Sequence, residues 1–137
     1  MKKRELVSAI MTTNPITVHL NRSVRDVAKI FEEKSIRHVP VVSGKDLIGM
    51  ISKNDIERIS FVAGQQDSSI NTQIFDGLNI EQIMTKQVDT VETKDEIRDA
   101  AKLLSAGKYN ALPVIQDGQL QGIVTSTDII NYLLEQY

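Results

Sequence analysis

An internal repeat constrains the fold of this 137-residue chain more than any other feature of its sequence. Shifting the sequence by 73 positions aligns residues 10–56 with residues 83–129 without a gap, and 15 of the 47 aligned positions are identical. A repeat of this length indicates two copies of one supersecondary unit, neither of which can bury its apolar face alone. We therefore expect two similar halves that fold as one cooperative unit.

Both copies predict the same succession of secondary-structure elements. A short strand at Thr17-Val18 or Thr90-Val91 precedes a stretch with apolar residues at helical spacing. A hairpin follows, and its second-copy turn contains Asp117-Gly118, a strong hairpin signal between two apolar runs. A second helix is expected to begin near Asp55 or Asp128. The order β-α-β-β-α in each copy predicts a mixed α/β (α+β) fold.

The ends of the first helix in each copy are also marked in the sequence. In the first copy, Asn21 or Ser23 is the expected N-cap. In the second copy, the run 93–96 (Thr-Lys-Asp-Glu) predicts a capping box. Gly107 stands where a left-handed C-terminal cap is expected.

The expected boundaries are a first repeat over residues 1–63, a linker over 64–79 and a second repeat over 80–137. The linker contains a polar, loop-like run followed by apolar residues. Two aromatic residues near it, Phe61 and Phe75, are interpreted either as core residues or as part of an interface or lid.

The composition excludes several classes of protein. The chain has no cysteine, which excludes disulfides, a thiolate nucleophile and Cys-ligated zinc or iron–sulfur sites. Its two histidines, His19 and His38, are too few for a multi-histidine metal cage, so no metal site is expected. There is no run of ~18 apolar residues to span a membrane. The basic N-terminus lacks the apolar stretch of a signal peptide, so a cytoplasmic location is expected.

Charge is distributed unevenly along the chain. Residues 1–68 contain 11 Lys and Arg against 8 Asp and Glu, a net charge of +3, whereas residues 69–137 contain 5 against 10, a net charge of -5. This difference reflects either ordinary surface variation or an anionic ligand held mainly by the first half. The overall net charge of -2 argues against a nucleic-acid partner.

The segment 122–128 (Gly-Ile-Val-Thr-Ser-Thr-Asp) marks a strand that ends where a helix begins. The first amides of a helix lack intrahelical partners, and its dipole is positive at this end, so a phosphate is favoured there. The Thr125 hydroxyl is a phosphate donor, and the Asp128 carboxylate matches two ribose hydroxyls. Alternatively, Thr125, Thr127 and Asp128 cap the helix, and the two roles are compatible.

The first copy has the same pattern with more basic residues. Ser52 and Asp55 keep the hydroxyl and the carboxylate, and Lys53 adds a positive charge where the second copy has Ser126. Arg37 and His38 are compatible with polyphosphate, but strand alternation points them to opposite faces. The alternative is that Arg37 is solvated and His38 half-buried.

Together, the duplicated Met-Thr, Thr-Val, apolar-Pro-Val and Gly-apolar-apolar-Ser/Thr-x-x-Asp motifs resemble a tandem pair of CBS domains, known as a Bateman module. The resemblance covers essentially the whole chain, so a stand-alone pair without a catalytic or membrane domain is expected. It implies two pseudo-symmetric repeats packed sheet to sheet, with clefts that take adenosine derivatives such as AMP, ADP, ATP or S-adenosylmethionine. It also implies pairing of two modules into a homodimer.

The resemblance also implies which residues contact the ligand. Backbone near Pro40 and Pro113 would meet the adenine, although a proline at a strand edge needs no ligand to explain it. The expected ligand-binding residues are Thr17, Arg37, His38, Val39, Pro40, Ser52, Lys53 and Asp55 in the first copy and Thr90, Ala111, Leu112, Pro113, Thr125, Ser126 and Asp128 in the second.

The sequence thus predicts a regulatory sensor that needs no cofactor, binds an adenine nucleotide or related adenosyl compound as regulator, and acts on a regulated protein that the sequence does not identify. It contains neither a Gly-x-Ser-x-Gly nucleophile motif nor a phosphate-binding loop, so no enzyme activity and no catalytic residue are expected. The alternatives are a CBS-pair scaffold for interaction or dimerisation without nucleotide, and a Mg²⁺-responsive module.

Overall fold

A computed structural model describes residues 5–62 and 76–137, which form two compact units. The first-repeat unit comprises residues 16–44 and 48–87, and the second-repeat unit comprises residues 1–15, 45–47 and 88–137. The expected linker over 64–79 lies outside the described residues except for its last four positions, as do Phe75 and the side chain of Phe61.

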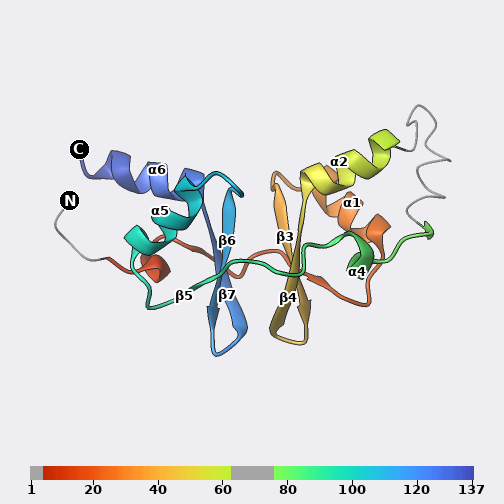
Figure 1. Cartoon of the computed structure of the whole chain (residues 1–137), viewed down its shortest axis with the longest axis horizontal. Helices are drawn as coiled ribbons and strands as arrows, with labels where there is room; N and C mark the ends of the chain where they lie inside the picture. The colour runs from red at the N-terminus through yellow and green to blue at the C-terminus, as the bar shows by residue number, and fades with distance from the viewer. Residues whose placement is uncertain (1–4, 63–75) are drawn as a thin grey trace. The chain divides into compact units, whose positions relative to one another are not determined.

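The first-repeat unit has a three-stranded sheet with two helices on one face (Figure 1). Its strands are β2 (Val18–His19), β3 (His38–Ser43) and β4 (Asp46–Ser52), and β2 pairs in parallel with β3. Its helices are α1 (Val24–Glu33), α2 (Lys53–Val62) and the short α4 (Ile80–Ile83).

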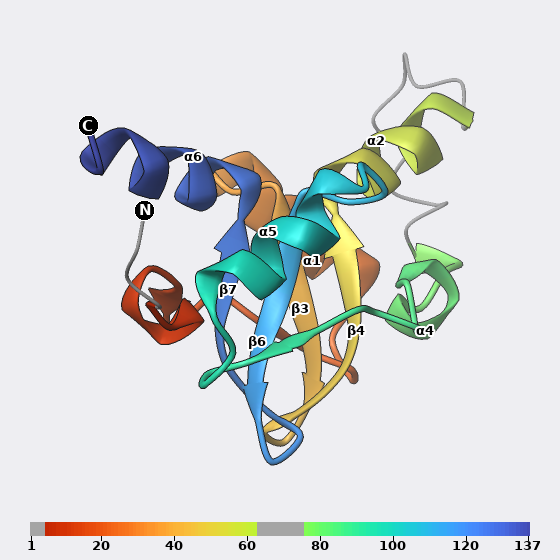
Figure 2. The ribbon, with the colours of Figure 1, turned by 60° about the vertical axis from the view of Figure 1, so that its left-hand side comes forward.

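The second-repeat unit repeats this arrangement. Its strands are β5 (Val91–Glu92), β6 (Ala111–Gln116) and β7 (Gln119–Thr125), with β5 parallel and β7 antiparallel to β6. Its helices are α5 (Ile97–Ser105) and α6 (Ser126–Glu135), which lie on one side of the β6–β7 hairpin (Figures 1 and 2). The N-terminal segment adds the 3-10 helix η1 (Val7–Ala9) and strand β1 (Thr12–Thr13), which pairs with β7. The predicted β-α-β-β-α order and the mixed α/β class are confirmed.

The expected cap marks the start of α1 correctly but not the start of α5. Ser23 is the N-cap of α1 and forms a capping box with Asp26. The capping box predicted at 93–96 is wrong, because α5 begins at Ile97 and its box joins Glu96 to Asp99. The carboxylate of Asp95 instead accepts a hydrogen bond from the Glu92 amide at 2.8 Å.

The predicted turns are confirmed by their backbone angles. Asp117 and Gly118 have φ of 54° and 78°, the paired positive values that a tight hairpin turn requires. Gly107 has φ of 79° just after the α5 helix, which is the expected left-handed cap.

Each unit has its own apolar core. In the first-repeat unit the core joins both helices, the sheet and Ile80 of α4, and it contains Val18, Val24, Val27, Phe31, Val39, Val41, Ile51, Ile56 and Ile80. In the second-repeat unit it contains Val7, Val91, Ala100, Leu104, Leu112, Val114 and Val124. Val7 and Ile80 are fully buried although they lie outside the repeated strands and main helices.

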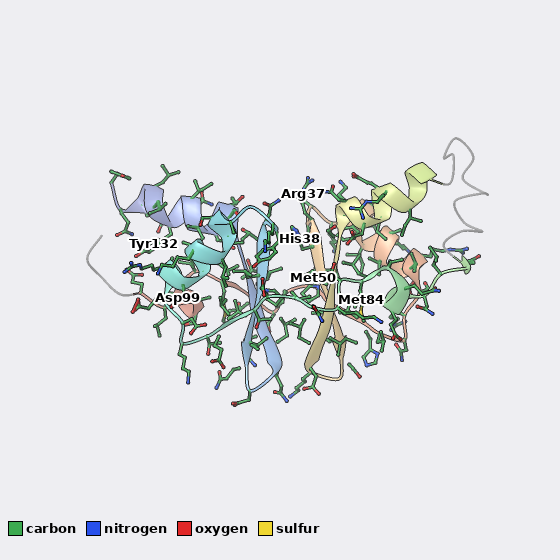
Figure 3. The ribbon with its side chains drawn as sticks, viewed as in Figure 1. Arg37, His38, Met50, Met84, Asp99 and Tyr132 are labelled. Atoms are coloured by element: carbon green, nitrogen blue, oxygen red, sulfur yellow. The ribbon has the colours of Figure 1, made fainter. Side chains whose placement is uncertain are left out.

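The segment that precedes each repeat in the chain completes the unit of the other repeat (Figure 2). Before the second repeat, Thr85 exchanges two backbone hydrogen bonds with Met50 of β4, at 2.9 and 3.1 Å, and Figure 3 shows Met84 beside β4. Before the first repeat, Thr12 of β1 lies opposite Ile123 of β7. The chain therefore crosses between the two units at both of these segments.

Candidate ligand site

In each unit the start of the middle strand meets the start of the helix that follows the hairpin, which is α2 or α6. The Lys53 amide donates to the Arg37 carbonyl at 2.8 Å, and the Ser126 amide donates to the Asn110 carbonyl at 2.9 Å. Figure 3 shows Arg37 and His38 at the end of β3 that adjoins α2. This contact brings the predicted residues of the strand and of the helix together within each unit.

The hydroxyl and carboxylate at each helix start form a reciprocal capping box. The Ser52 amide donates to Oδ2 of Asp55 at 2.9 Å, and the Asp55 amide donates to Oγ of Ser52 at 3.1 Å. In the second repeat the Thr125 amide donates to Oδ2 of Asp128 at 2.8 Å, and the Asp128 amide donates to Oγ1 of Thr125 at 3.1 Å. The helices therefore begin two residues earlier than predicted, because the Asp occupies the third helical position rather than the cap.

The first amides of these helices lack intrahelical partners, as expected, but most of them are bonded to atoms outside the helix. Two of the first three helical amides are already bonded, one to the carbonyl just before the middle strand, of Arg37 or Asn110, and one to the capping hydroxyl. The second helical amide, of Asn54 or Thr127, has no intrahelical acceptor by position. A bound phosphate would therefore depend more on side chains than on the helix start.

The capping boxes leave specific polar atoms available. Each capping hydroxyl accepts one hydrogen bond and retains its proton for donation. Oδ1 of Asp55 lies 3.8 Å from the Arg58 guanidinium. Oδ1 of Asp128 has no side-chain partner among residues 5–62 and 76–137. Each site thus keeps one donor hydroxyl and one acceptor carboxylate oxygen.

The basic residues of the first repeat differ in exposure. Arg37 is exposed, whereas His38 and Lys53 are half-buried. Burial lowers the pKa of His38 below its usual value, the positive charge of Arg37 lowers it further, and the Asp55 carboxylate opposes both effects. His38 is therefore held towards its neutral form.

The other predicted residues lie along the same strands. Val39, Pro40, Ala111, Leu112 and Pro113 are buried, which leaves mainly their backbone for contact. Each proline stands in the middle strand, one residue before that strand pairs with β2 or β5, so the missing N–H costs no hydrogen bond to these strands. Thr17 is exposed and Thr90 half-buried, each just before an outer strand.

A further polar pair in the second repeat was not predicted. The Tyr109 hydroxyl donates to the Asp89 carboxylate, and this hydrogen bond raises the pKa of Tyr109. The repeat alignment contains the signal, because both positions are polar in the second copy and apolar, Ile16 and Ile36, in the first. The pair flanks Thr90 and Asn110.

The described parts of the chain contain no group of three or more His, Asp or Glu side chains arranged to hold a metal ion. None of the described helices has the length and apolar character needed to cross a membrane.

Solved structures similar to this chain are pairs of CBS domains. The CBS domain pair of protein MJ0100, in complex with 5′-methylthioadenosine and S-adenosyl-L-methionine, is 29% identical with a TM-score of 0.80, covering 98% of this chain and 100% of that chain. CBSX2 in complex with AMP is 26% identical with a TM-score of 0.80, covering 96% and 98%.

Longer proteins contain similar segments. The L-aspartate semialdehyde sulfurtransferase of Methanocaldococcus jannaschii is 35% identical over 127 residues, which cover 90% of this chain but 22% of that protein. Among the similar curated proteins, the matched share ranges from 22% to 48% of the relative's length. The chain therefore spans less than half the length of these relatives.

The family model of the CBS domain matches residues 7–61 and 80–135, one match for each repeat. The two matches cover most of the chain and agree with the duplicated β-α-β-β-α order and with the similar structures. This chain belongs to the CBS domain family and contains a tandem pair of these domains.

Proposed function

We propose that the chain is a regulatory module that binds an adenosine derivative at the ends of β4 and β7. The observation that carries the proposal is the duplicated Ser/Thr-x-x-Asp box, in which one carboxylate oxygen accepts no hydrogen bond and the hydroxyl donates none within the described residues; only Oδ1 of Asp55 has an ion-pair contact, at 3.8 Å from Arg58. Two similar CBS pairs are seen with adenosyl compounds, which supports the same ligand class here.

The unused atoms suit the two polar parts of a nucleotide. A ribose hydroxyl donates to Oδ1 of Asp128 or Asp55, and the capping hydroxyl of Thr125 or Ser52 donates to a phosphate oxygen. The backbone around Pro40 and Pro113 lies in the adjoining strand and is proposed to meet the adenine edge. Occupying these atoms leaves the helix caps intact, so ligand binding and capping coexist.

The Asp128→Asn variant tests this assignment. The amide oxygen of asparagine retains the cap by accepting from the Thr125 amide, while its NH₂ group replaces the acceptor Oδ1 with a donor. We expect AMP binding at this site, measured by calorimetry on the full chain, to fall at least tenfold while the thermal midpoint stays close to that of the wild type. Asp128→Ala is the matched comparison, because it loses both the ligand acceptor and the cap.

Two results would contradict the proposal. One is unchanged AMP affinity in both Asp128→Asn and the equivalent Asp55→Asn. The other is the absence of any thermal shift of the wild-type chain with millimolar AMP, ATP or S-adenosylmethionine. A ligand at 100 times its dissociation constant stabilises the native state by ~2.7 kcal/mol, which is a shift of several degrees.

Self-association is a second candidate function, favoured by the outer face of α6. Ile130, Leu133 and Leu134 are 56%, 38% and 65% exposed, and Tyr137 beyond the helix end is fully exposed. The first repeat has the exposed Glu57 at the position that matches Ile130. We propose that α6 pairs with α6 of a second copy, which gives a homodimer.

The variant Ile130→Glu tests this pairing, because it introduces the residue that the first repeat carries at the same position. Sedimentation equilibrium is expected to show a dimer for the wild type and a monomer for the variant. A wild-type chain that is monomeric at 100 times the concentration used for ligand binding would contradict the proposal.

A further inference from the structure

The two proposed ligand sites differ in charge at matched positions. We infer that the first-repeat site selects nucleotides with a longer phosphate chain, whereas the second-repeat site selects against them. This inference rests on the proposed function, because it concerns which adenosine derivative each site takes.

Two cations lie together in the first-repeat site. The Lys53 amide bonds to the Arg37 carbonyl at 2.8 Å, so both side chains originate at the same end of the sheet. Neither side chain forms an ion pair with any carboxylate in the described ranges. Asp55 is the nearby carboxylate, and Arg58 lies 3.8 Å from it. The local excess of positive charge is therefore available to an anionic ligand.

The second-repeat site has neutral residues in place of both cations. Asn110 occupies the position of Arg37, and Ser126 occupies the position of Lys53. The backbone hydrogen bond between these two residues, at 2.9 Å, matches that of the first repeat. The two sites therefore share a backbone frame and differ in the side chains attached to it.

Carboxylates dominate the charge of the second-repeat site. Asp128 and Asp89 both lack a cationic partner among the described residues. The Tyr109 hydroxyl that bonds Asp89 is neutral at physiological pH, since its pKa is raised. Lys108 is exposed beside this site and offsets one of the two negative charges. A polyphosphate would meet net repulsion here, whereas a neutral or cationic adenosyl compound would not.

The expected selectivity follows from the number of cations. A contact between a phosphate and a partly exposed cation changes affinity by about fivefold. AMP has one phosphate and ATP has three, which lets ATP reach both cations at once. Because the single phosphate of AMP reaches one cation, the second contact makes the expected ratio of ATP to AMP affinity about fivefold higher at the first-repeat site.

The test exchanges the discriminating residues between the repeats in the full chain. In an Asp128→Asn background, where the second-repeat site is disabled, AMP and ATP are titrated by calorimetry in magnesium-free buffer. Adding Arg37→Asn and Lys53→Ser is expected to lower the ATP-to-AMP affinity ratio about fivefold. In an Asp55→Asn background, Asn110→Arg with Ser126→Lys is expected to raise it.

A charge-matched control separates local contacts from overall charge. Arg22→Asn with Lys45→Ser removes the same two charges by the same substitutions. Both residues are exposed at the hairpin-turn end of the β3–β4 strands, where the Gly44 amide bonds to His19. A drop in the ratio as large in this control as in the site variant would overturn the inference.

The remaining outcomes distinguish a failure of the proposed selectivity from a failure of the proposed nucleotide binding. If the wild type binds AMP and ATP but neither exchange changes their affinity ratio, the selectivity is refuted while nucleotide binding stands. If the wild type binds neither nucleotide, both the selectivity and the proposed function are overturned. The reciprocal exchange in the second repeat keeps the test decisive if the first-repeat variant fails to fold.

Discussion

Two glycines lie against the segments that precede the two repeats, and they show how tightly these segments pack in the unit of the other repeat. A Cβ on Gly122 would lie 2.6 Å from the Thr12 carbonyl oxygen and 2.7 Å from the Met11 sulfur. A Cβ on Gly49 would lie 2.5 Å from the Met84 sulfur but 3.0 Å from the nearest backbone atom. Gly122→Ala must therefore displace the backbone of β1, whereas Gly49→Ala mainly displaces the end of a flexible side chain.

These contacts predict different costs for the two alanine substitutions. Overpacking costs about 1–3 kcal/mol, and replacing glycine with alanine returns about 0.4–1 kcal/mol by restricting the unfolded chain. We place the overpacking cost of Gly122→Ala near the upper limit and that of Gly49→Ala near the middle of this range, which gives net losses of about 2 and 1 kcal/mol. For a chain of this size, 2 kcal/mol corresponds to a fall of roughly 6–10 °C in Tm.

Urea unfolding followed by far-UV circular dichroism measures these losses. Double-mutant cycles then separate the side-chain contact from the backbone contact. Met84→Ala should recover about 1 kcal/mol when combined with Gly49→Ala, while Met11→Ala should recover under about 0.5 kcal/mol of the Gly122→Ala loss. Equal losses for the two glycine variants, or equal recovery in the two cycles, would refute this reasoning.

Three further predictions concern stability. The pKa of His38 is lowered in the folded state, so its contribution to the free energy of unfolding is complete above about pH 6.5 and is lost as the pH falls through the folded pKa. Between about pH 7.5 and 5.5, the His38→Ala variant should therefore lose less stability than the wild type, as measured by urea unfolding. Ser23→Ala should cost about 1 kcal/mol because it removes a helix cap, measured in the same way. The fragment 16–87 should be more protected from amide exchange than the fragment 1–68, because only the first contains the buried Ile80; equal protection would contradict the assignment of α4 to this core.

The repeat and the turn chemistry made most of the fold predictable from the sequence. The β-α-β-β-α order follows from apolar spacing that recurs in both copies, and the hairpin turn follows from Asp117-Gly118. Helices α2 and α6 begin two residues before the expected starts at Asp55 and Asp128, because each carboxylate caps its helix from the third helical position. Local signals of this kind need no knowledge of tertiary contacts.

The same signals could not predict that the segment before each repeat packs in the unit of the other repeat. Ile-Met-Thr stands before both repeats, so its apolar residues fit the sheet of either copy equally well. Only the tertiary structure shows that Thr85 bonds to Met50 of the first repeat and that Thr12 pairs with Ile123 of the second. A duplicated motif identifies the type of contact but leaves its partner undetermined.

The candidate site also could not be predicted from its central motif alone, because that motif is not unique in the chain. Ser23 and Asp26 form the same hydroxyl-and-carboxylate box as Ser52 and Asp55, but they do so at the exposed start of α1. A box becomes a candidate ligand site where its helix start also bonds to the start of a neighbouring strand, as Lys53 does through the Arg37 carbonyl. That contact joins residues 16 positions apart, and the hydroxyl-and-carboxylate spacing does not encode it.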